Sequence, residues 1–439
     1  MRSVANLTLK FHITDPRVER IICDLNTSPW QTKLVGGAVR DAIMGKHSYD
    51  LDCATTASPT DVIAILERHS LKPITVGIAF GTVGCVLASG YTIEITHLRK
   101  DTLSDGRYAT ARITDDWHTD AQRRDFTMNA LYADLDGTVY DPLGRGFRDL
   151  QEGCVCFIGE PSARITEDYL RILRYYRFYA HFGRLHPRAV DQLAIATHRE
   201  GLARISRERI KKELSGLFTG TYRLTAVGYL LTSGVWEQIF KAPAQYFDIE
   251  RMKRADDLQH TRMIRDSPYN EELAFRFPYL FYFYALLKPE HHSSLESILR
   301  KALSFSKNES NYIQKLKACM QDFITHPVTV SSLDQGTINC FLYTHGKSVF
   351  IQALLLAWID GSFISGADQA SLVSAITTTN VPEFPVRGTD ISALYPNIVG
   401  KNMGKALHMT ERWWFARQCT ASKKECLDFI KDIPLTTVT

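Results

Sequence analysis

The chain has 439 residues, of which 45% are hydrophobic and 23% are charged, and its formal net charge is +4. This composition is globular and excludes a disordered or fibrous chain, and the length predicts two to four domains. The longest mostly apolar runs are Phe277–Leu287 and Phe350–Ile359. Both are far shorter than the ~20 residues that span a bilayer, so we expect no membrane-spanning segment.

The nine cysteines are an odd number and include no CxxC pair; the closest two are Cys154 and Cys156. We therefore expect reduced thiols in a cytoplasmic compartment, with neither a disulfide framework nor a zinc site. Residues 1–25 mix charged with apolar side chains, which predicts no signal peptide.

Residues 1–150 predict a mixed α/β region. Its expected elements, in chain order, are a strand at Lys33–Gly37, a helix starting at Arg40–Met44, an extended Tyr49–Cys53, a helix at Pro59–Ser70, a hairpin of Thr82–Leu87 with Thr92–Thr96, and a hairpin at Tyr132–Tyr140. Thr60 is expected to cap the second helix, with Val62, Ile63 and Leu66 on one face.

From about Ile165 onward the apolar spacing is helical, and Val381–Leu394 is expected to be a loop or linker. Helices that follow a sheet predict an α+β fold and argue against a TIM barrel or a doubly wound sheet. We expect two parts, an α/β region over about residues 1–150 and a long all-helical remainder.

The first motif that suggests chemistry is Leu34-Val-Gly-Gly-Ala-Val-Arg-Asp41, followed by Asp50-Leu-Asp52. Two glycines before a helix let backbone amides approach a phosphate, and Arg40 adds a charged fork. Asp50 and Asp52 share one face of a strand and suit Mg²⁺. Each piece alone is typical of a turn or a solvated acidic edge, whereas the combination favours a metal–triphosphate site.

The second motif runs from Arg123 to Ala130 and reads Arg-Arg-Asp-Phe-Thr-Met-Asn-Ala. By default it is a solvated helix start. Beside a metal–triphosphate site, Arg123, Arg124 and Asn129 become candidates for binding phosphate and ribose.

The third motif runs from Glu167 to Phe178. We expect one helix, capped by Thr166, in which Asp168 adjoins Arg171 and the row continues to Arg174 and Arg177. One interpretation is a surface ladder of ion pairs. The other is an edge that reads a nucleobase, with a carboxylate accepting from an amine and an arginine donating to the ring.

In this order, together with Asp141-Pro-Leu-Gly-Arg-Gly-Phe-Arg-Asp-Leu150, these motifs resemble those of the class II tRNA nucleotidyltransferases and bacterial poly(A) polymerases over roughly residues 30 to 215. The resemblance implies a polymerase-β-like head (1–150), a helical neck (151–220), and a helical body and tail that hold tRNA (221–439). It also implies CCA addition from CTP and ATP without a template.

The resemblance assigns roles to the motif residues. Asp50 and Asp52 would hold two Mg²⁺ ions, which activate the tRNA 3′-hydroxyl and neutralise the leaving pyrophosphate. The expected nucleotide contacts are Gly37, Arg40, Arg123, Arg124, Asn129, Asp168, Arg171, Arg174 and Arg177. Glu94 lies in a strand that alternates with isoleucines, so it is either an outward-facing position or a third active-site carboxylate.

Relatives that add only part of CCA, or poly(A), differ in two segments. Thr75–Thr82 contains no arginine, unlike the basic stretch of the poly(A) polymerases, and Arg99–Asp120 is as long as in enzymes that switch from CTP to ATP. The second segment is either such a lever or a mobile surface loop. A CC-adding, A-adding or poly(A)-adding enzyme, a non-catalytic RNA-binding relative and a phosphohydrolase remain alternatives, although the last lacks a His-Asp pair.

Overall fold

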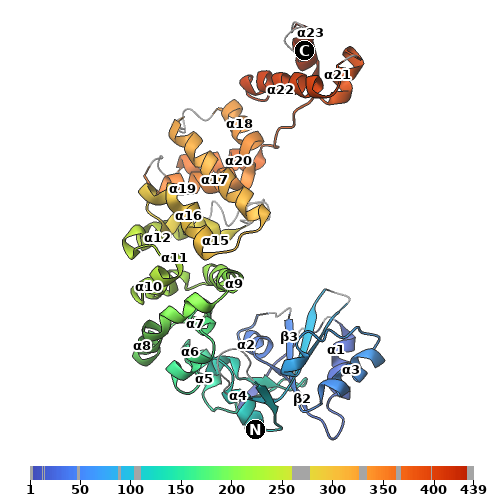
Figure 1. The fold of residues 1–439 in the computed structure, drawn as a ribbon, viewed down its shortest axis with the longest axis vertical. Coiled ribbons are helices and arrows are strands. Elements are labelled where there is room, and N and C mark those ends of the chain that lie inside the picture. Colours follow the sequence, from blue (N-terminus) through green and yellow to red (C-terminus); the bar gives the residue numbers. More distant parts are fainter. Residues whose placement is uncertain are drawn as a thin grey trace. The chain divides into compact units, whose positions relative to one another are not determined.

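The computed structural model describes residues 3–11, 13, 15–46, 50–87, 90–102, 110–259, 277–325, 334–361, 367–396 and 398–432. The chain divides into two compact units, Met1–Ala242 and Pro243–Thr439, and each is described by itself. Figure 1 shows the strands in the blue-to-teal part of the chain and helices in the rest.

The first unit is built on a seven-stranded sheet with the order β1-β9-β8-β2-β3-β5-β4. Its strands are β1 (Ser3–Thr8), β2 (Thr32–Val35), β3 (Asp50–Thr55), β4 (Thr82–Val86), β5 (Thr92–His97), β8 (Tyr132–Ala133) and β9 (Thr138–Tyr140). The pair β3 and β5 is parallel, and the other neighbours are antiparallel. A separate two-stranded sheet pairs β6 (Arg99–Thr102) with β7 (Thr110–Ile113).

Strand β5 shows the alternation of side chains that leaves Glu94 accessible. Ile93, Ile95 and His97 are buried, whereas Glu94 between them is exposed. Because side chains alternate along a strand, the apolar positions pack into the core and the polar positions share the opposite face.

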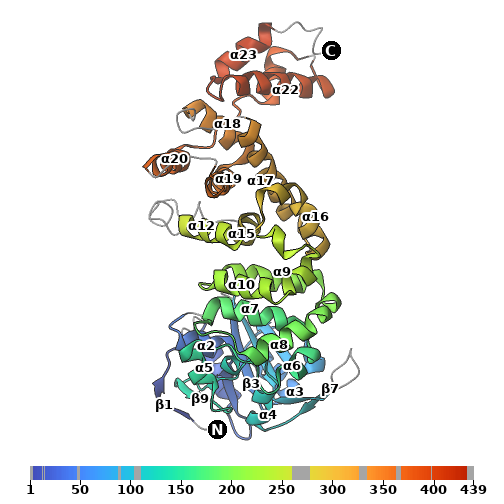
Figure 2. The ribbon, with the colours of Figure 1, turned by 90° about the vertical axis from the view of Figure 1, so that its left-hand side faces the viewer.

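Helices cover the sheet and continue the first unit beyond it. They are α1 (Pro16–Asp24), α2 (Gly37–Ile43), α3 (Pro59–Arg68), η1 (Ile78–Phe80), α4 (Trp117–Gln122), η2 (Thr127–Asn129), α5 (Gly146–Glu152), α6 (Pro161–Glu167), α7 (Leu170–Phe182), α8 (Ala189–His198), η3 (Arg199–Arg204), α9 (Arg207–Phe218), α10 (Arg223–Thr232) and α11 (Val235–Phe240). Helix α7 packs against both α9 and α10, as Figure 2 shows. Its buried Tyr175 and Phe178 contact Phe126 of the preceding segment, with ring centroids 6.0 and 5.3 Å apart.

The described residues of the second unit are helical apart from short connections. The helices are η4 (Ala244–Tyr246), α12 (Ile249–Gln259), α15 (Pro278–Leu286), η5 (Pro289–His291), α16 (His292–Ala302), α17 (Lys307–Thr325), α18 (Gln335–His345), α19 (Lys347–Ile359), α20 (Ala367–Thr378), α21 (Gly388–Leu394), α22 (Lys401–Ala416) and α23 (Lys423–Asp432). No single helix in the described ranges is long and apolar enough to cross a membrane. By length and composition, α18 and α19 pass that test only as a pair bent by 112°.

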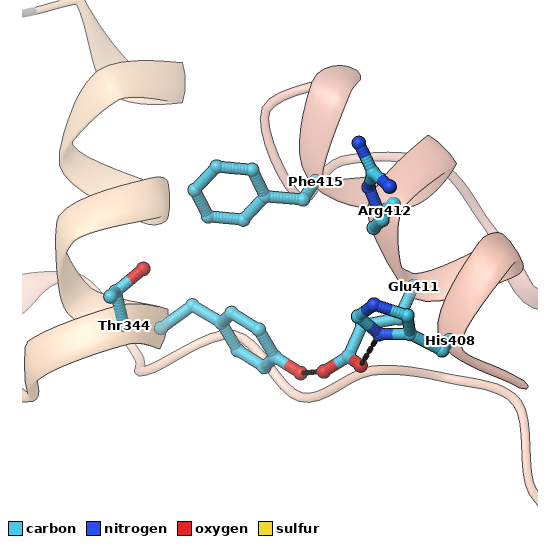
Figure 3. Close-up of a pocket in the computed structure, with 6 residues that line it drawn as sticks. Thr344, His408, Glu411, Arg412 and Phe415 are labelled. Atoms are coloured by element: carbon cyan, nitrogen blue, oxygen red, sulfur yellow. Dashed lines mark hydrogen bonds and ion pairs between the residues drawn. The ribbon is translucent and has the colours of Figure 1, made fainter. Parts of the chain in front are cut away.

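A pocket of about 650 Å³ lies between α18 and α22 in the second unit. Figure 3 shows Phe415 and Arg412 on one side and His408 with Glu411 on another. Tyr343 also lines the pocket, and its hydroxyl donates a hydrogen bond to Glu411.

Both hairpins and the helical remainder predicted from the sequence are confirmed. The prediction that Thr60 caps α3 was wrong. The cap is Ser58, whose side chain accepts from the backbone amide of Asp61 in a capping box, because Pro59 occupies the first helical position and starts the helix earlier. The buried face of that helix contains Ile65 in place of Ile63.

Two further boundaries differ from the prediction. Helix α2 begins at Gly37, directly after the turn, rather than near Arg40. The expected linker Val381–Leu394 is irregular only to Arg387, because Arg387 and Asp390 form a capping box that starts α21.

The polar stretch Arg99–Asp120, expected to be a mobile loop, is largely regular. Its ends pair as β6 and β7, with Arg99 opposite Ile113, and α4 follows. Residues 103–109 lie outside the described residues.

Candidate active site

The first part of the site is the turn between β2 and α2. Gly36 has φ +68°, a left-handed conformation that strains any other residue. A Cβ atom built on Gly36 would lie 3.7 Å from Nη1 of Arg124 and 3.8 Å from the carbonyl oxygen of Asn129. The predicted glycine motif therefore lies against the predicted second motif.

The carboxylates occupy the neighbouring strands β3 and β5. Asp52 is the register partner of Glu94, and Asp50 is the partner of Thr92. Residues side by side in a parallel pair share a face of the sheet, so the half-buried Asp52 and the exposed Glu94 lie on the same face. The side chain of Asp50 lies outside what the structure describes.

Glycine also opens the space on the other side of Glu94. On β4 the partner of Glu94 is Gly84, and a Cβ atom at Gly84 would lie 3.8 Å from Cγ of Glu94. The sequence left Glu94 either outward-facing or part of the site. The register places this outward-facing residue beside Asp52, so the two descriptions are compatible.

Arg40 links the glycine turn to the second and third motifs. Its Nη1 donates a hydrogen bond of 2.7 Å to Oδ1 of Asn129, and Nε donates to Asp41 at 2.9 Å. Its guanidinium lies over the rings of Phe178 and Phe182, with Cζ at 5.1 and 4.7 Å from the ring centroids. These contacts hold Arg40 in one orientation between the head and α7.

Asp125 continues the same network. Its Oδ1 accepts from Nδ2 of Asn129 at 3.0 Å, and its Oδ2 accepts from Nε of Arg174 at 2.7 Å. Although burial opposes ionisation, the charge of Arg174 and the two hydrogen bonds hold the pKa of Asp125 below its usual range. A continuous chain of contacts therefore runs from Arg40 through Asn129 and Asp125 to Arg174.

Asp120 anchors both arginines of the second motif. It accepts from Nε of Arg123 at 2.7 Å, from Nη2 of Arg124 at 3.0 Å and from the hydroxyl of Tyr132 at 2.7 Å. Burial alone would raise its pKa, but the charges of Arg124 and Arg123 outweigh burial and lower the pKa to about 2. A third arginine, Arg164, donates to the carbonyl oxygens of Arg123 and Arg124.

The start of the third motif differs from the prediction. Thr166 does not cap a helix; it lies inside α6, whose last residue is Glu167, and α7 begins at Leu170. Asp168 lies in the break with extended backbone, where its Oδ1 accepts from the amide of Leu170 at 3.0 Å. One continuous helix from Glu167 is therefore wrong.

Asp168 and Arg171 adjoin through the backbone, because the amide of Arg171 donates to the carbonyl oxygen of Asp168 at 3.0 Å, but their side chains bind different partners. Oδ2 of Asp168 accepts from Nη2 of Arg209 on α9 at 2.8 Å. Arg171 instead donates to Oε2 of Glu167 at 2.6 Å and to the carbonyl oxygen of Arg164 at 2.9 Å.

The two later arginines of the motif converge on one aromatic ring. The guanidinium carbons of Arg174 and Arg177 lie 5.2 and 4.7 Å from the ring centroid of Phe178. Nε of Arg177 lies 3.1 Å from Oε2 of the buried Glu213. Since Arg40 contacts the same ring, Phe178 holds three cations of the site together.

Comparisons with known proteins show which family the chain belongs to. The family described as the Poly A polymerase head domain matches residues 32–156. The CCA tRNA nucleotidyltransferase 1, mitochondrial, of Danio rerio is 32% identical over 417 residues, which cover 91% of this chain and 86% of that protein. The chain belongs to the CCA tRNA nucleotidyltransferase family. The human protein of the same name is 41% identical over 197 residues, 44% of either chain.

Solved structures of CCA-adding enzymes share the fold. The enzyme of Bacillus stearothermophilus in complex with CTP has a TM-score of 0.63 and 23% identity, covering 92% of this chain and 94% of that one. The Thermotoga maritima enzyme complexed with tRNA has a TM-score of 0.59 and 19% identity, covering 98% and 97%. The α+β fold with a polymerase-like head is thereby confirmed, and the likeness extends well beyond the residues 30–215 that the motifs covered.

Sequence reasoning missed several residues of this CCA tRNA nucleotidyltransferase family member that hold the predicted side chains in place. Asp120 had a local signal, because it lies three and four residues before Arg123 and Arg124. Arg209 and Glu213 had none, because their partners lie 41 and 36 residues earlier and only the packing of α9 on α7 brings them together.

Proposed function

We propose that this chain adds C, C and A to the 3′ end of tRNA from CTP and ATP, releasing pyrophosphate. The observation that carries the proposal is the carboxylate pair Asp52 and Glu94 on the sheet of a head whose glycine turn lies against Arg124. The relatives named above are CCA tRNA nucleotidyltransferases and CCA-adding enzymes.

The ligand atoms that Asp52 and Glu94 offer decide whether these residues suit a divalent cation. Asp52 and Glu94 present hard oxygen ligands from one face of the sheet, which is the chemistry Mg²⁺ prefers. The residues fit, and we propose that Asp50 and Asp52 hold Mg²⁺, with Glu94 beside them. Bound there, Mg²⁺ would polarise the phosphate and lower the pKa of the attacking hydroxyl.

The residues around the glycine turn would position the triphosphate. Gly37 follows the turn, and Arg40 is held by Asn129, so its charge is placed before a nucleotide arrives. Arg123 and Arg124 are fixed by Asp120 in the same way. Preorganised charges of this kind lose no energy to reorientation during the reaction.

The α7 region would read the base. Asp168 and Arg171 are proposed to pair with the edge of C or A, while Arg174 and Arg177 contact phosphate or base. A carboxylate accepts from the exocyclic amine that both bases carry, and an arginine donates to ring acceptors. Because Asp168 is bonded to Arg209 and Arg171 to Glu167, each reading group has its own support.

The remaining assignments follow the same proposal. Residues 1–150 would form the catalytic head, 151–220 the neck and 221–439 the tRNA-holding body and tail. We propose a cytoplasmic location. Because a relative is named mitochondrial, cell fractionation is the experiment that tests this location.

The deciding experiment is incubation of the protein with tRNA lacking its 3′ end, CTP, ATP and Mg²⁺, with products resolved one nucleotide at a time. Addition of three nucleotides supports the proposal. Products ending after two C residues, or a single A on tRNA that already carries CC, or a long A tail would favour the CC-adding, A-adding or poly(A) alternatives. Binding without incorporation would favour a non-catalytic RNA-binding protein.

A matched pair of variants ties the activity to the sheet. Asp52→Asn removes a proposed metal ligand, whereas Glu67→Gln makes the same kind of change at an exposed residue of α3. Incorporation should be lost only in the first variant. Full incorporation by Asp52→Asn would remove its metal role.

A further inference from the structure

A cluster of soft and hard ligand atoms lies at the end of α5, outside the catalytic residues described above. Asp149, Cys154 and Cys156 each offer one ligand atom, and these atoms lie within 4.8 Å of one another. The two Sγ atoms are 3.1 Å apart. Gly153 has φ +75° and ends α5, and the amide of Cys154 donates to the carbonyl oxygen of Asp149 at 2.7 Å, so the reversal of the chain brings the three together.

We propose that Asp149, Cys154 and Cys156 bind one Zn²⁺ ion, with the fourth position open to water. Thiolates with a carboxylate suit this borderline-soft ion, whereas Mg²⁺ prefers oxygen ligands alone. The proposal departs from the expectation of no zinc site, which rested on the missing CxxC pairs, because here the third ligand would come from the preceding helix rather than from another cysteine pair.

The charges around the cluster favour a divalent cation. The side chain of Asp149 is 4% exposed, and Nη2 of Arg145 lies 3.3 Å from its Oδ1. This buried carboxylate places negative charge beside the two thiols, and that charge attracts a divalent ion. Arg188 also interacts electrostatically with the thiols, but both carboxylate oxygens of Asp191 already engage it.

The cluster is tied directly to the second motif. Thr127, which lies between Arg124 and Asn129 in the sequence, donates from Oγ1 to Oδ2 of Asp149 at 2.7 Å. Its amide donates to the carbonyl oxygen of Cys156 at 3.1 Å. A bound ion would therefore stiffen the support of that motif from behind, which is a positioning role. The binding itself does not depend on the proposed CCA addition.

The test uses the full-length, reduced and chelator-treated protein titrated with Co²⁺ and then with Zn²⁺. We expect one equivalent of Co²⁺ to produce thiolate-to-cobalt charge-transfer absorption, which Zn²⁺ removes and excess Mg²⁺ does not. Carboxylate sites elsewhere in the head cannot give this signal, because it requires a sulfur ligand. Failure of CCA addition would leave this readout unaffected, so the two proposals fail separately.

Three variants complete the design. Cys154→Ser and Cys156→Ser should each lose the absorption, and Cys23→Ser, at an exposed thiol on α1, should keep it. Zn²⁺ should also raise the melting temperature of the wild type and of Cys23→Ser but not of Cys154→Ser, a half-buried position that is less prone to misfolding. Absent absorption in the wild type, unchanged absorption in Cys154→Ser, or a Cys154–Cys156 disulfide in protein alkylated at cell lysis would overturn the proposal.

Discussion

Replacing Asp120 by asparagine should loosen the segment that carries Arg123 and Arg124 and slow both C and A addition. The side chain of Asp120 is 0% exposed, while those of Arg123 and Arg124 are 14% and 16% exposed. An amide keeps the shape of the carboxylate but removes the charge, so two nearly buried arginines lose their shared counter-ion. Removing one partner of such a group is strongly destabilising, because the remaining charge stays buried.

The pKa of Asp120 supplies the magnitude. It lies at about 2 instead of the usual 3.8. At ~1.36 kcal/mol for each unit of pKa, this difference is on the order of 2 kcal/mol in favour of the charged, folded state. Local opening should therefore become tens of times more frequent in Asp120→Asn.

Hydrogen-exchange mass spectrometry measures this opening directly, because it reports local free energies without assuming that the whole chain unfolds in one step. Peptides covering residues 117–132 should exchange tens of times faster in Asp120→Asn, and hardly faster in the control Asp115→Asn, whose carboxylate is exposed just before α4. Equal exchange rates in the two variants would refute the reasoning.

The same carboxylate predicts a pH dependence. Because folding lowers the pKa of Asp120, its stabilisation is fully present above the unfolded value near 3.8 and is lost as the pH falls toward about 2. The difference in exchange between the wild type and Asp120→Asn should therefore be constant at neutral pH and shrink only in strong acid. A difference that disappears near pH 6 would contradict this assignment.

Three further outcomes are expected from the geometry of the site. Glu94→Gln should slow C and A addition alike, by ~10- to 100-fold, the loss typical of a group that supports a metal ligand, and unchanged single-turnover rates would exclude Glu94 from the site. Arg209→Ala should leave stability nearly unchanged because Arg209 is 51% exposed, but it should increase misincorporation when CTP and ATP compete, since Asp168 loses its support; unaltered fidelity would count against a base-reading role. Replacing residues 103–109 by a short turn that keeps β6 and β7 should spare the two C additions and suppress the final A. Equal slowing of all three additions would contradict the hypothesis that this segment drives the switch from CTP to ATP.

The sequence predictions that succeeded depended on local patterns of residues. The alternation around Glu94 predicted a strand with one polar face, and the turn residues predicted both hairpins. The glycine motif and the second motif were expected to lie near each other, and Gly36 does lie against Arg124. Such features depend on residues a few positions apart, so they are readable without a fold.

Tertiary packing decided which side chains meet. Thr166 and the two acids after it predicted the start of a helix, yet the helix is interrupted at Asp168. The carboxylate of Asp168 accepts from the amide of Leu170 and binds Arg209 from α9. Propensity is a weak prior that such long-range bonds override.

The sequence by itself determined the composition of the site: paired carboxylates, a glycine turn and rows of arginines in a recognisable order. Only the tertiary structure decided that Asp52 lies beside Glu94, since that neighbour depends on the register of two parallel strands about 40 residues apart. It alone also decided that Asp149 joins Cys154 and Cys156, because the turn at Gly153 brings a helix residue back to the thiols. Spacing along the chain specifies local geometry, whereas contacts between distant segments follow from how the whole sheet and its helices bury their apolar faces.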